Sequence, residues 1–168
     1  LLLAEDSRAI PVFLGPLEDS GFVDVSGGDG GVLKRVYQAG ESGNCAFDRY
    51  VVDLKYVVYL PSLRVVDVSK NDMWENKEHR FTLGSGEVMR GMEIVAKSME
   101  RKEKARFRIR SDYAFGEEGS PPKIPPKTEW LIVDVEMMGL RPPIRDKMFL
   151  RANEVLPYVL GRKEKVSI

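Results

Sequence analysis

The chain has 168 residues, and its 26 Lys and Arg are balanced by 26 Asp and Glu, so the formal net charge is zero. This balance argues against general binding to nucleic acid or to a membrane surface, because both favour an excess of basic residues. A single cysteine, Cys45, excludes an internal disulfide framework, and a single histidine, His79, excludes a site built from several histidines. The length predicts one domain with extensions.

No part of the sequence is typical of a membrane anchor or a leader peptide. No apolar run approaches the roughly 20 residues that span a bilayer, and the first residues, LLLAEDS, lack the basic start of a secretory signal. The single cysteine fits a reducing compartment. We therefore expect a protein of the cytoplasm or nucleus, with the cytoplasm as the default, and we predict neither a cofactor nor a metal site.

Residues 1–30 are predicted to form an N-terminal extension that ends in a flexible joint. The joint contains GGDGG, which could be taken for a phosphate loop, but it lacks the Lys-Ser/Thr pair of a P-loop. We therefore favour the joint over the phosphate site. Four apolar residues suggest that the extension docks somewhere: Val12, Phe13, Leu14 and Leu17.

Residues 31–140 are predicted to form the domain itself, and its first segments are strand-like. VLKRVYQ at 32–38 runs into a glycine-containing turn. HRFTL at 79–83 predicts a short strand. Between them, residues 50–60 alternate in the manner of a half-buried strand, with one face formed by Val52, Leu54, Tyr56, Val58 and Leu60.

The pattern then becomes helical and returns to strands. Residues 86–99 carry one apolar stripe, whereas residues 103–110 and 129–138 alternate again. This order predicts an α+β fold, in which an antiparallel sheet packs on a single helix. The inward residues of the three elements are Val88, Met92, Val95 and Met99, then Ala105, Phe107 and Ile109, then Leu131, Val133, Val135 and Met137.

Between the last two strands lies a loop that combines stiffness with apolar residues. YAFGEEGSPPKIPP, residues 113–126, contains four prolines and cannot be a helix or a central strand. Tyr113, Phe115 and Ile124 within it are costly to leave in water. The composition therefore indicates a rigid loop that covers something apolar.

Two motifs in this region resemble the FKBP family of macrolide-binding peptidyl-prolyl isomerases. VMRGME, residues 88–93, is similar to the family's V-I-x-G-W-E, and residues 112–126 resemble its D-Y-A-Y-G motif followed by I-P-P. The resemblance extends over residues 31–140 and implies the FKBP fold, a twisted antiparallel sheet wrapped around one short helix. The stiff loop would then be the flap over a shallow apolar pocket, kept formed by its prolines.

The resemblance also implies the pocket residues. Tyr56 and Asp67 match the family's polar wall positions. Met92 replaces the floor tryptophan, and Phe115 replaces the flap tyrosine and so has no hydroxyl to donate. The other matched positions are Val88, Ile124 and Met89, the last in place of isoleucine. The other departures are Val66 and Val133 in place of phenylalanine, His79 in place of another aromatic residue, and Ser120 and Lys123 in the flap.

Rotation of an X-Pro bond requires a dry aromatic pocket and groups that favour the twisted amide, rather than a nucleophile or a metal. Losing a tryptophan and two phenylalanines would lower the rate by about 10² to 10³. We therefore expect a degenerate isomerase that acts as a protein-binding module and binds macrolides weakly or not at all. The alternative is an active isomerase with a relaxed pocket, favoured by Tyr56, Asp67 and the intact I-P-P.

Several of these residues also have a purely structural interpretation. Met92 and Tyr56 lie at positions that fit simple core packing, and His79 fits a strand residue better than a base. Asp67 would be costly as an unpaired buried carboxylate, so we expect it to pair with the Tyr56 hydroxyl or with a basic group. We expect a solvated strand face, rather than an RNA site, from the outward residues Lys104, Arg106, Arg108 and Arg110.

Met92, together with the first-strand letters GVLK, is similar to the germline members of the family. Those proteins carry a degenerate isomerase domain followed by TPR repeats. The resemblance implies a co-chaperone whose repeats hold the tail of heat shock protein ninety and which loads piRNA into Argonaute-class (Piwi) proteins. Residues 141–168 would then be a linker and helix that lead to the repeats. Neither a membrane partner nor direct nucleic-acid binding is expected.

Overall fold

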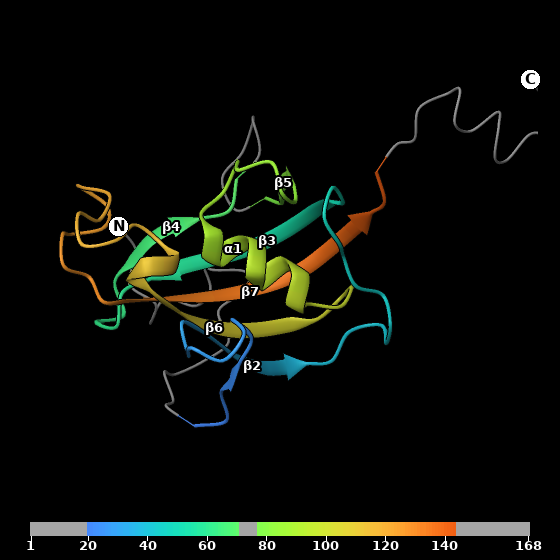
Figure 1. The fold of residues 1–168 in the computed structure, drawn as a ribbon, viewed down its shortest axis with the longest axis horizontal. Helices are drawn as coiled ribbons and strands as arrows, with labels where there is room; N and C mark the ends of the chain where they lie inside the picture. Colours follow the sequence, from blue (N-terminus) through green and yellow to red (C-terminus); the bar gives the residue numbers. More distant parts are fainter. Residues whose placement is uncertain (1–19, 71–76, 144–168) are drawn as a thin grey trace, which may run out of the picture.

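The computed structural model describes residues 20–70 and 77–143, and within them one sheet packs on one α-helix (Figure 1). The docking expected of the N-terminal apolar residues and the helix expected near the C-terminus lie outside the described residues. The helix α1 spans Arg90–Ser98, and a 3-10 turn, η2, spans Ser111–Tyr113. The strands are β1 (Val23–Asp24), β2 (Val32–Gln38), β3 (Val51–Tyr59), β4 (Val65–Val68), β5 (His79–Thr82), β6 (Lys104–Arg110) and β7 (Trp130–Arg141).

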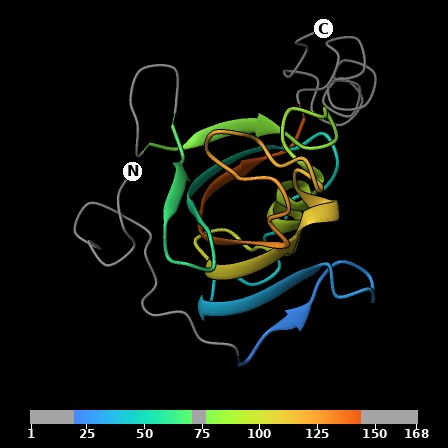
Figure 2. The same ribbon diagram turned by 90° about the vertical axis from the view of Figure 1, so that its left-hand side faces the viewer.

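The described strands form one sheet in which every pairing is antiparallel. The order is β1-β2-β6-β7-β3-β4, and β5 also pairs with β3. β3 has β7 along one side, while its other side pairs with β5 over its first half and with β4 near its end. Figure 2 shows the sheet curving around the helix. The predicted α+β fold is confirmed.

The core lies between α1 and the face of the sheet that the alternation predicts to be inward. The helix buries Met92, Val95 and Ala96, with Met99 directly after it, in one cluster with inward residues of β3, β6 and β7. Gly91 allows this close approach, because a Cβ at that position would lie 2.6 Å from Ile109 Cγ2 and 2.8 Å from the Tyr113 carbonyl oxygen.

The helix begins later than predicted. The predicted bounds were 86–99, but Met89 is extended (φ −58°, ψ 152°), and Gly86 has φ of +78°. Two strands, β1 and β4, are not in the prediction. β1 has only two residues, and the four residues of β4, Val-Val-Asp-Val, do not alternate strictly between apolar and polar. No helix among the described residues is long and apolar enough to cross a membrane.

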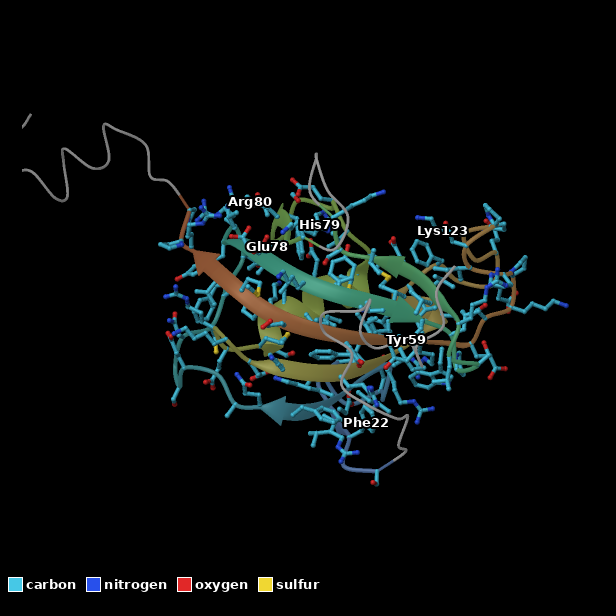
Figure 3. The ribbon with its side chains drawn as sticks, turned by 180° about the vertical axis from the view of Figure 1, so that it is seen from behind. Phe22, Tyr59, Glu78, His79, Arg80 and Lys123 are labelled. Carbon is cyan, nitrogen blue, oxygen red and sulfur yellow. The ribbon has the colours of Figure 1, made fainter. Side chains whose placement is uncertain are left out.

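The face of the sheet opposite α1 corrects one expectation. Arg106 is not on a solvated strand face but is 1% exposed. Its Nε and Nη2 donate to the two carboxylate oxygens of Asp134, at 2.7 and 3.0 Å, and the Tyr59 hydroxyl donates to the same carboxylate at 2.9 Å. Figure 3 views this side of the sheet, with Tyr59 labelled. The alternation gave the correct face of β6 but could not predict that a carboxylate on β7 would bury this arginine.

The segment before β2 is joined to the sheet, whereas the sequence predicts a flexible joint there. Val23 and Asp24 pair with Lys34 and Leu33 of β2. In the loop that follows, the Asp24 carboxylate accepts hydrogen bonds from the amides of Ser26 and Gly30. The division of the chain at residues 30 and 140 remains a prediction.

Candidate functional site

A largely apolar cavity of 330 Å³ lies beside the start of α1. Four segments form its walls: β3, β4, the start of α1 with the residues that lead into it, and the proline-containing loop after η2. Its lining residues are Tyr56, Val58, Val66, Asp67, Glu87, Val88, Met89, Met92, Phe115, Ser120, Lys123 and Ile124.

The base of the cavity is aliphatic. Met92 is 4% exposed and belongs to the main core cluster, as do Val58, Val66 and Ile124. Met92 is therefore both a core residue and a lining residue, so its two interpretations are compatible. A methionine fills irregular space flexibly, but it does not offer the flat ring surface on which another ring can stack.

On the β3 wall, Tyr56 is held by His79. The Tyr56 hydroxyl and His79 Nδ1 are 2.9 Å apart, and the two rings lie 5.9 Å apart. Burial, and then the nearby Asp67 charge, raise the pKa of Tyr56 to about 12, so its hydroxyl stays protonated. Burial lowers the pKa of His79. In a neutral ring protonated on Nε2, Nδ1 accepts a hydrogen bond from the Tyr56 hydroxyl.

Asp67, at the mouth of the cavity, pairs with a basic group rather than with Tyr56. Its Oδ1 lies 3.5 Å from Lys123 Nζ, and its side chain is 41% exposed. The premise of a buried carboxylate is therefore wrong, although one of the two partners expected for it is correct. Because both groups are well exposed, this ion pair contributes little to stability. It does connect β4 to the loop across the cavity mouth.

The loop of residues 113–126 forms the outer wall, as its stiffness predicts. Ser120 and Ile124 exchange two backbone hydrogen bonds, of 2.9 and 3.0 Å, which close the loop around the Pro121–Pro122 cis peptide. Ile124 points inward and is buried, whereas Phe115 lines the cavity but is 42% exposed. A phenylalanine here adds apolar surface at the rim and no hydrogen-bond donor.

Two of the predicted pocket residues do not line the cavity. Val133 is fully buried in the core from β7, and His79 lies behind Tyr56. Two residues that line the cavity were not predicted as site residues. Val58 was assigned only to the inward face of β3, and Glu87 carries no signal beyond its position next to Val88. The described residues contain no cluster of three or more side chains suited to hold a metal ion.

The comparisons with known proteins agree with this geometry. Residues 45–138 match the family model described as FKBP-type peptidyl-prolyl cis-trans isomerase. The chain belongs to this family. Among solved structures, this chain matches part of the crystal structure of the 3 FKBP domains of wheat FKBP73, with a TM-score of 0.64 and 25% identity, covering 73% of this chain and 49% of that one.

Two curated relatives differ in the activity that their names state. The chain is 37% identical over 123 residues to peptidyl-prolyl cis-trans isomerase FKBP20-1 of Arabidopsis thaliana, covering 71% of this chain and 62% of that protein. It is 36% identical over 117 residues to the human protein named inactive peptidyl-prolyl cis-trans isomerase FKBP6, covering 69% of this chain and 34% of that protein. The FKBP domain therefore has named isomerases and named inactive proteins among its relatives, and it spans only part of each.

Proposed function

We propose that this FKBP domain is a protein-binding module with little or no isomerase activity. The observation that carries the proposal is the aliphatic base of the cavity, which includes the buried lining residue Met92. A prolyl ring bound there meets flexible aliphatic carbon rather than an aromatic floor. Apolar contact of this kind holds a ground state and a twisted transition state about equally, and such uniform binding does not raise the rate of the chemical step.

The polar groups around the cavity support the same proposal. The Tyr56 hydroxyl is directed at His79, and the Asp67 carboxylate faces Lys123. Phe115, at the rim, has no hydroxyl to donate to a substrate carbonyl. Preferential stabilisation of the twisted amide would require donors or edges that are free to act on it as resonance is lost. The cavity keeps the shape of a binding site, while the Tyr56 hydroxyl and the Asp67 carboxylate each have a partner within the protein.

The second candidate is an active isomerase with a relaxed pocket. It is favoured by the intact wall, in which Tyr56, Asp67 and Ile124 all line the cavity. The relatives named as isomerases support it as well. The two candidates differ in one measurable quantity, the rate of X-Pro isomerisation.

The test is an isomerisation assay on an X-Pro peptide at high protein concentration, beside a competent FKBP. We expect a rate at least about 100-fold below that of the competent protein, because several aromatic contacts are missing. We expect Met92→Trp to raise the rate about tenfold, since one ring of stacking surface returns. Met92→Leu is the matched control, because it fills the base without a ring. A wild-type rate within tenfold of the competent protein, inhibited by macrolide, would reverse the assignment.

For the whole protein, we extend the proposal to a cytoplasmic, germline co-chaperone. Under this proposal it holds the tail of heat shock protein ninety through TPR repeats and assists piRNA loading of Argonaute-class (Piwi) proteins. The support is the resemblance carried by Met92 and GVLK, together with the relatives named inactive. The test is binding of the full-length protein to a synthetic C-terminal peptide of heat shock protein ninety. We expect saturable binding that a scrambled peptide does not reproduce, and equal binding of the two peptides would count against the proposal.

A further inference from the structure

Tyr113 connects three parts of the fold that meet next to the cavity. It is the last residue of η2, lies two residues before Phe115, and is 4% exposed. One side of its ring is packed so closely on Gly31 that a side chain at Gly31 would collide with it. The Arg90 guanidinium, at the start of α1, lies 4.3 Å from the ring centroid. The Tyr113 side chain therefore contacts both the loop before β2 and the start of α1, and it lies at the beginning of the loop that forms the cavity wall.

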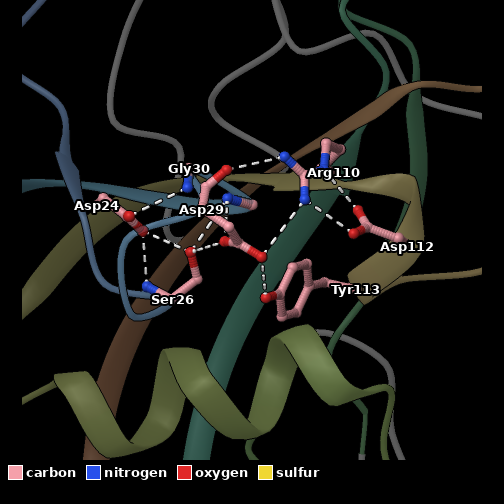
Figure 4. A network of polar contacts seen from close by, with 8 residues as sticks. Asp24, Ser26, Asp29, Gly30, Arg110, Asp112 and Tyr113 are labelled. Carbon is pink, nitrogen blue, oxygen red and sulfur yellow. Dashed lines mark hydrogen bonds and ion pairs between the residues drawn. The ribbon is translucent and has the colours of Figure 1, made fainter.

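The hydroxyl of Tyr113 is bound by the loop that precedes β2. It donates to Asp29 Oδ2 at 2.5 Å (Figure 4). The other oxygen of this carboxylate, Oδ1, accepts hydrogen bonds from Ser26 Oγ at 2.6 Å and from the Gly31 amide at 2.9 Å. Arg110 completes the contact, because its Nη1 donates to the Asp29 carbonyl oxygen at 3.0 Å.

The protonation states keep this contact intact. Hydrogen bonds, first from Ser26 and then from Tyr113, hold the pKa of Asp29 well below its ordinary value. The hydrogen bond to Asp29 raises the pKa of Tyr113. The acceptor is therefore charged and the donor is protonated across the neutral pH range, and hydrogen bonds of this charge-assisted kind are the stronger ones.

Phe115 depends on this anchor for its position. Its side chain is 42% exposed, so few contacts of its own restrain it. The turn around it is closed by the amides of Ala114 and Gly116, which both bond to the Ser111 carbonyl oxygen, at 3.0 and 2.8 Å. A shift of Tyr113 would therefore move the whole turn and, with it, the Phe115 ring at the cavity rim.

We propose that Asp29 is a positioning residue for the cavity, because through Tyr113 it fixes the turn that presents Phe115 to a bound ligand. The inference rests on the proposed function, in which the cavity binds a proline-containing protein segment. It also assigns a role to the GGDGG motif, whose last glycine, Gly31, allows the loop to approach the Tyr113 ring and whose aspartate accepts the hydrogen bond from its hydroxyl. The N-terminal loop thereby becomes part of what determines cavity affinity.

The experiment uses the full 168-residue chain with 4-fluorophenylalanine at position 115, observed by fluorine NMR, and a tetrapeptide with an X-Pro bond as the probe. We expect Asp29→Ala to shift or broaden the Phe115 signal and to weaken peptide binding about three- to tenfold, in the range of coupling between contacting residues. Tyr113→Phe should do the same, and the double variant should lose no more than either single one. Asp29→Asn, which keeps an acceptor oxygen, should lie between wild type and Asp29→Ala.

Asp112 provides the matched control. Its carboxylate also binds the Arg110 guanidinium, at 2.6 and 2.9 Å, but the Tyr113 hydroxyl is bound to Asp29 instead. Asp112→Asn should therefore leave both the Phe115 signal and the affinity within about twofold of wild type, even if it lowers stability. Circular dichroism of each variant distinguishes loss of the fold from displacement of Phe115. If Asp29→Ala does not fold, Tyr113→Phe replaces it as the test variant.

Three results would overturn the inference: an unchanged Phe115 signal in a folded Asp29→Ala protein, losses of affinity that multiply in the double variant, or an equal effect of Asp112→Asn. If the wild-type chain binds no X-Pro peptide, the proposed ligand of the cavity is wrong. The fluorine signal still decides whether Asp29 positions Phe115, so the two failures are distinguishable.

Discussion

At the scale of single residues, two polar side chains that line the cavity have partners within the protein. Tyr56 and Asp67 are present, but the hydroxyl faces His79 and the carboxylate faces Lys123. The sequence predicts only that Asp67 pairs with the Tyr56 hydroxyl or with a basic group. The contacts that occupy them depend on β5 and on the proline-containing loop, and neither adjoins Tyr56 or Asp67 in the sequence.

His79 gives a prediction about pH. Its pKa in the folded protein is lowered, chiefly by burial, from an ordinary value of 6.5. Between the folded value and 6.5 the unfolded chain binds more protons, so the stabilising contribution is present above pH 6.5 and is lost as the pH falls below it. We expect the free energy of unfolding, measured by urea denaturation, to fall as the pH is lowered from 7.5 to 5.5. The size of the fall should match the lowered pKa of a single histidine.

His79→Gln is the control, because glutamine keeps an acceptor for the Tyr56 hydroxyl but does not titrate in this range. Since His79 is the sole histidine of the 168-residue chain, the wild-type curve should be the steeper of the two. Parallel curves for the two proteins would show that burial of His79 does not affect its proton affinity.

At the scale of elements, the loop from Asp24 to Gly31 connects β1 to β2 and also contacts Arg110 and Tyr113, which precede the proline-containing loop. β1 pairs with β2, the Arg110 amide donates to the Gly31 carbonyl oxygen at 2.8 Å, and Asp29 binds Tyr113. A short run of glycine and aspartate is typical of a flexible joint, and the sequence predicts such a joint at GGDGG. The same residues also suit a tight loop, because glycine adopts positive φ without strain and aspartate accepts backbone hydrogen bonds.

This gives a prediction for the domain boundary. A chain that starts at Gly31 should be less stable than one that starts at Ser20 by about 2 to 4 kcal/mol, because β1 and several hydrogen bonds, one of them to a buried tyrosine, are removed. Chemical denaturation of the two truncated chains measures the difference. Equal free energies of unfolding would support the boundary at residue 31 and would mean that the loop adds nothing to stability.

At the scale of the whole molecule, the basic strand β6 lies among acidic side chains and aromatic rings. Arg106 binds Asp134, Arg110 binds Asp112 and Asp29, and the Arg108 guanidinium lies 5.2 Å from the Trp130 ring centroid. A buried pair such as Arg106–Asp134 leaves no charge for a phosphate. The balanced net charge is thus reflected in local pairing on this strand. The absence of direct RNA binding stays a prediction.

The sequence by itself determined the sheet-on-helix architecture, the inward faces of β3, β6 and β7, and most of the cavity lining. These follow from local periodicity and from two motifs, and both can be recognised within one segment of chain. Val133 lies in the core and does not line the cavity, although Val58, its partner across the β3–β7 pairing, does. An inward strand position therefore predicts burial but not contact with the cavity.

Only the tertiary structure decided the partners: His79 for Tyr56, Lys123 for Asp67, Asp134 for Arg106 and Asp29 for Tyr113. Each of these pairs joins residues from separate segments, brought together by strand order and loop path. Sequence patterns report the environment of a residue, such as buried or exposed. They do not report the identity of its neighbour, because that depends on contacts far along the chain that form only when the sheet closes around the helix.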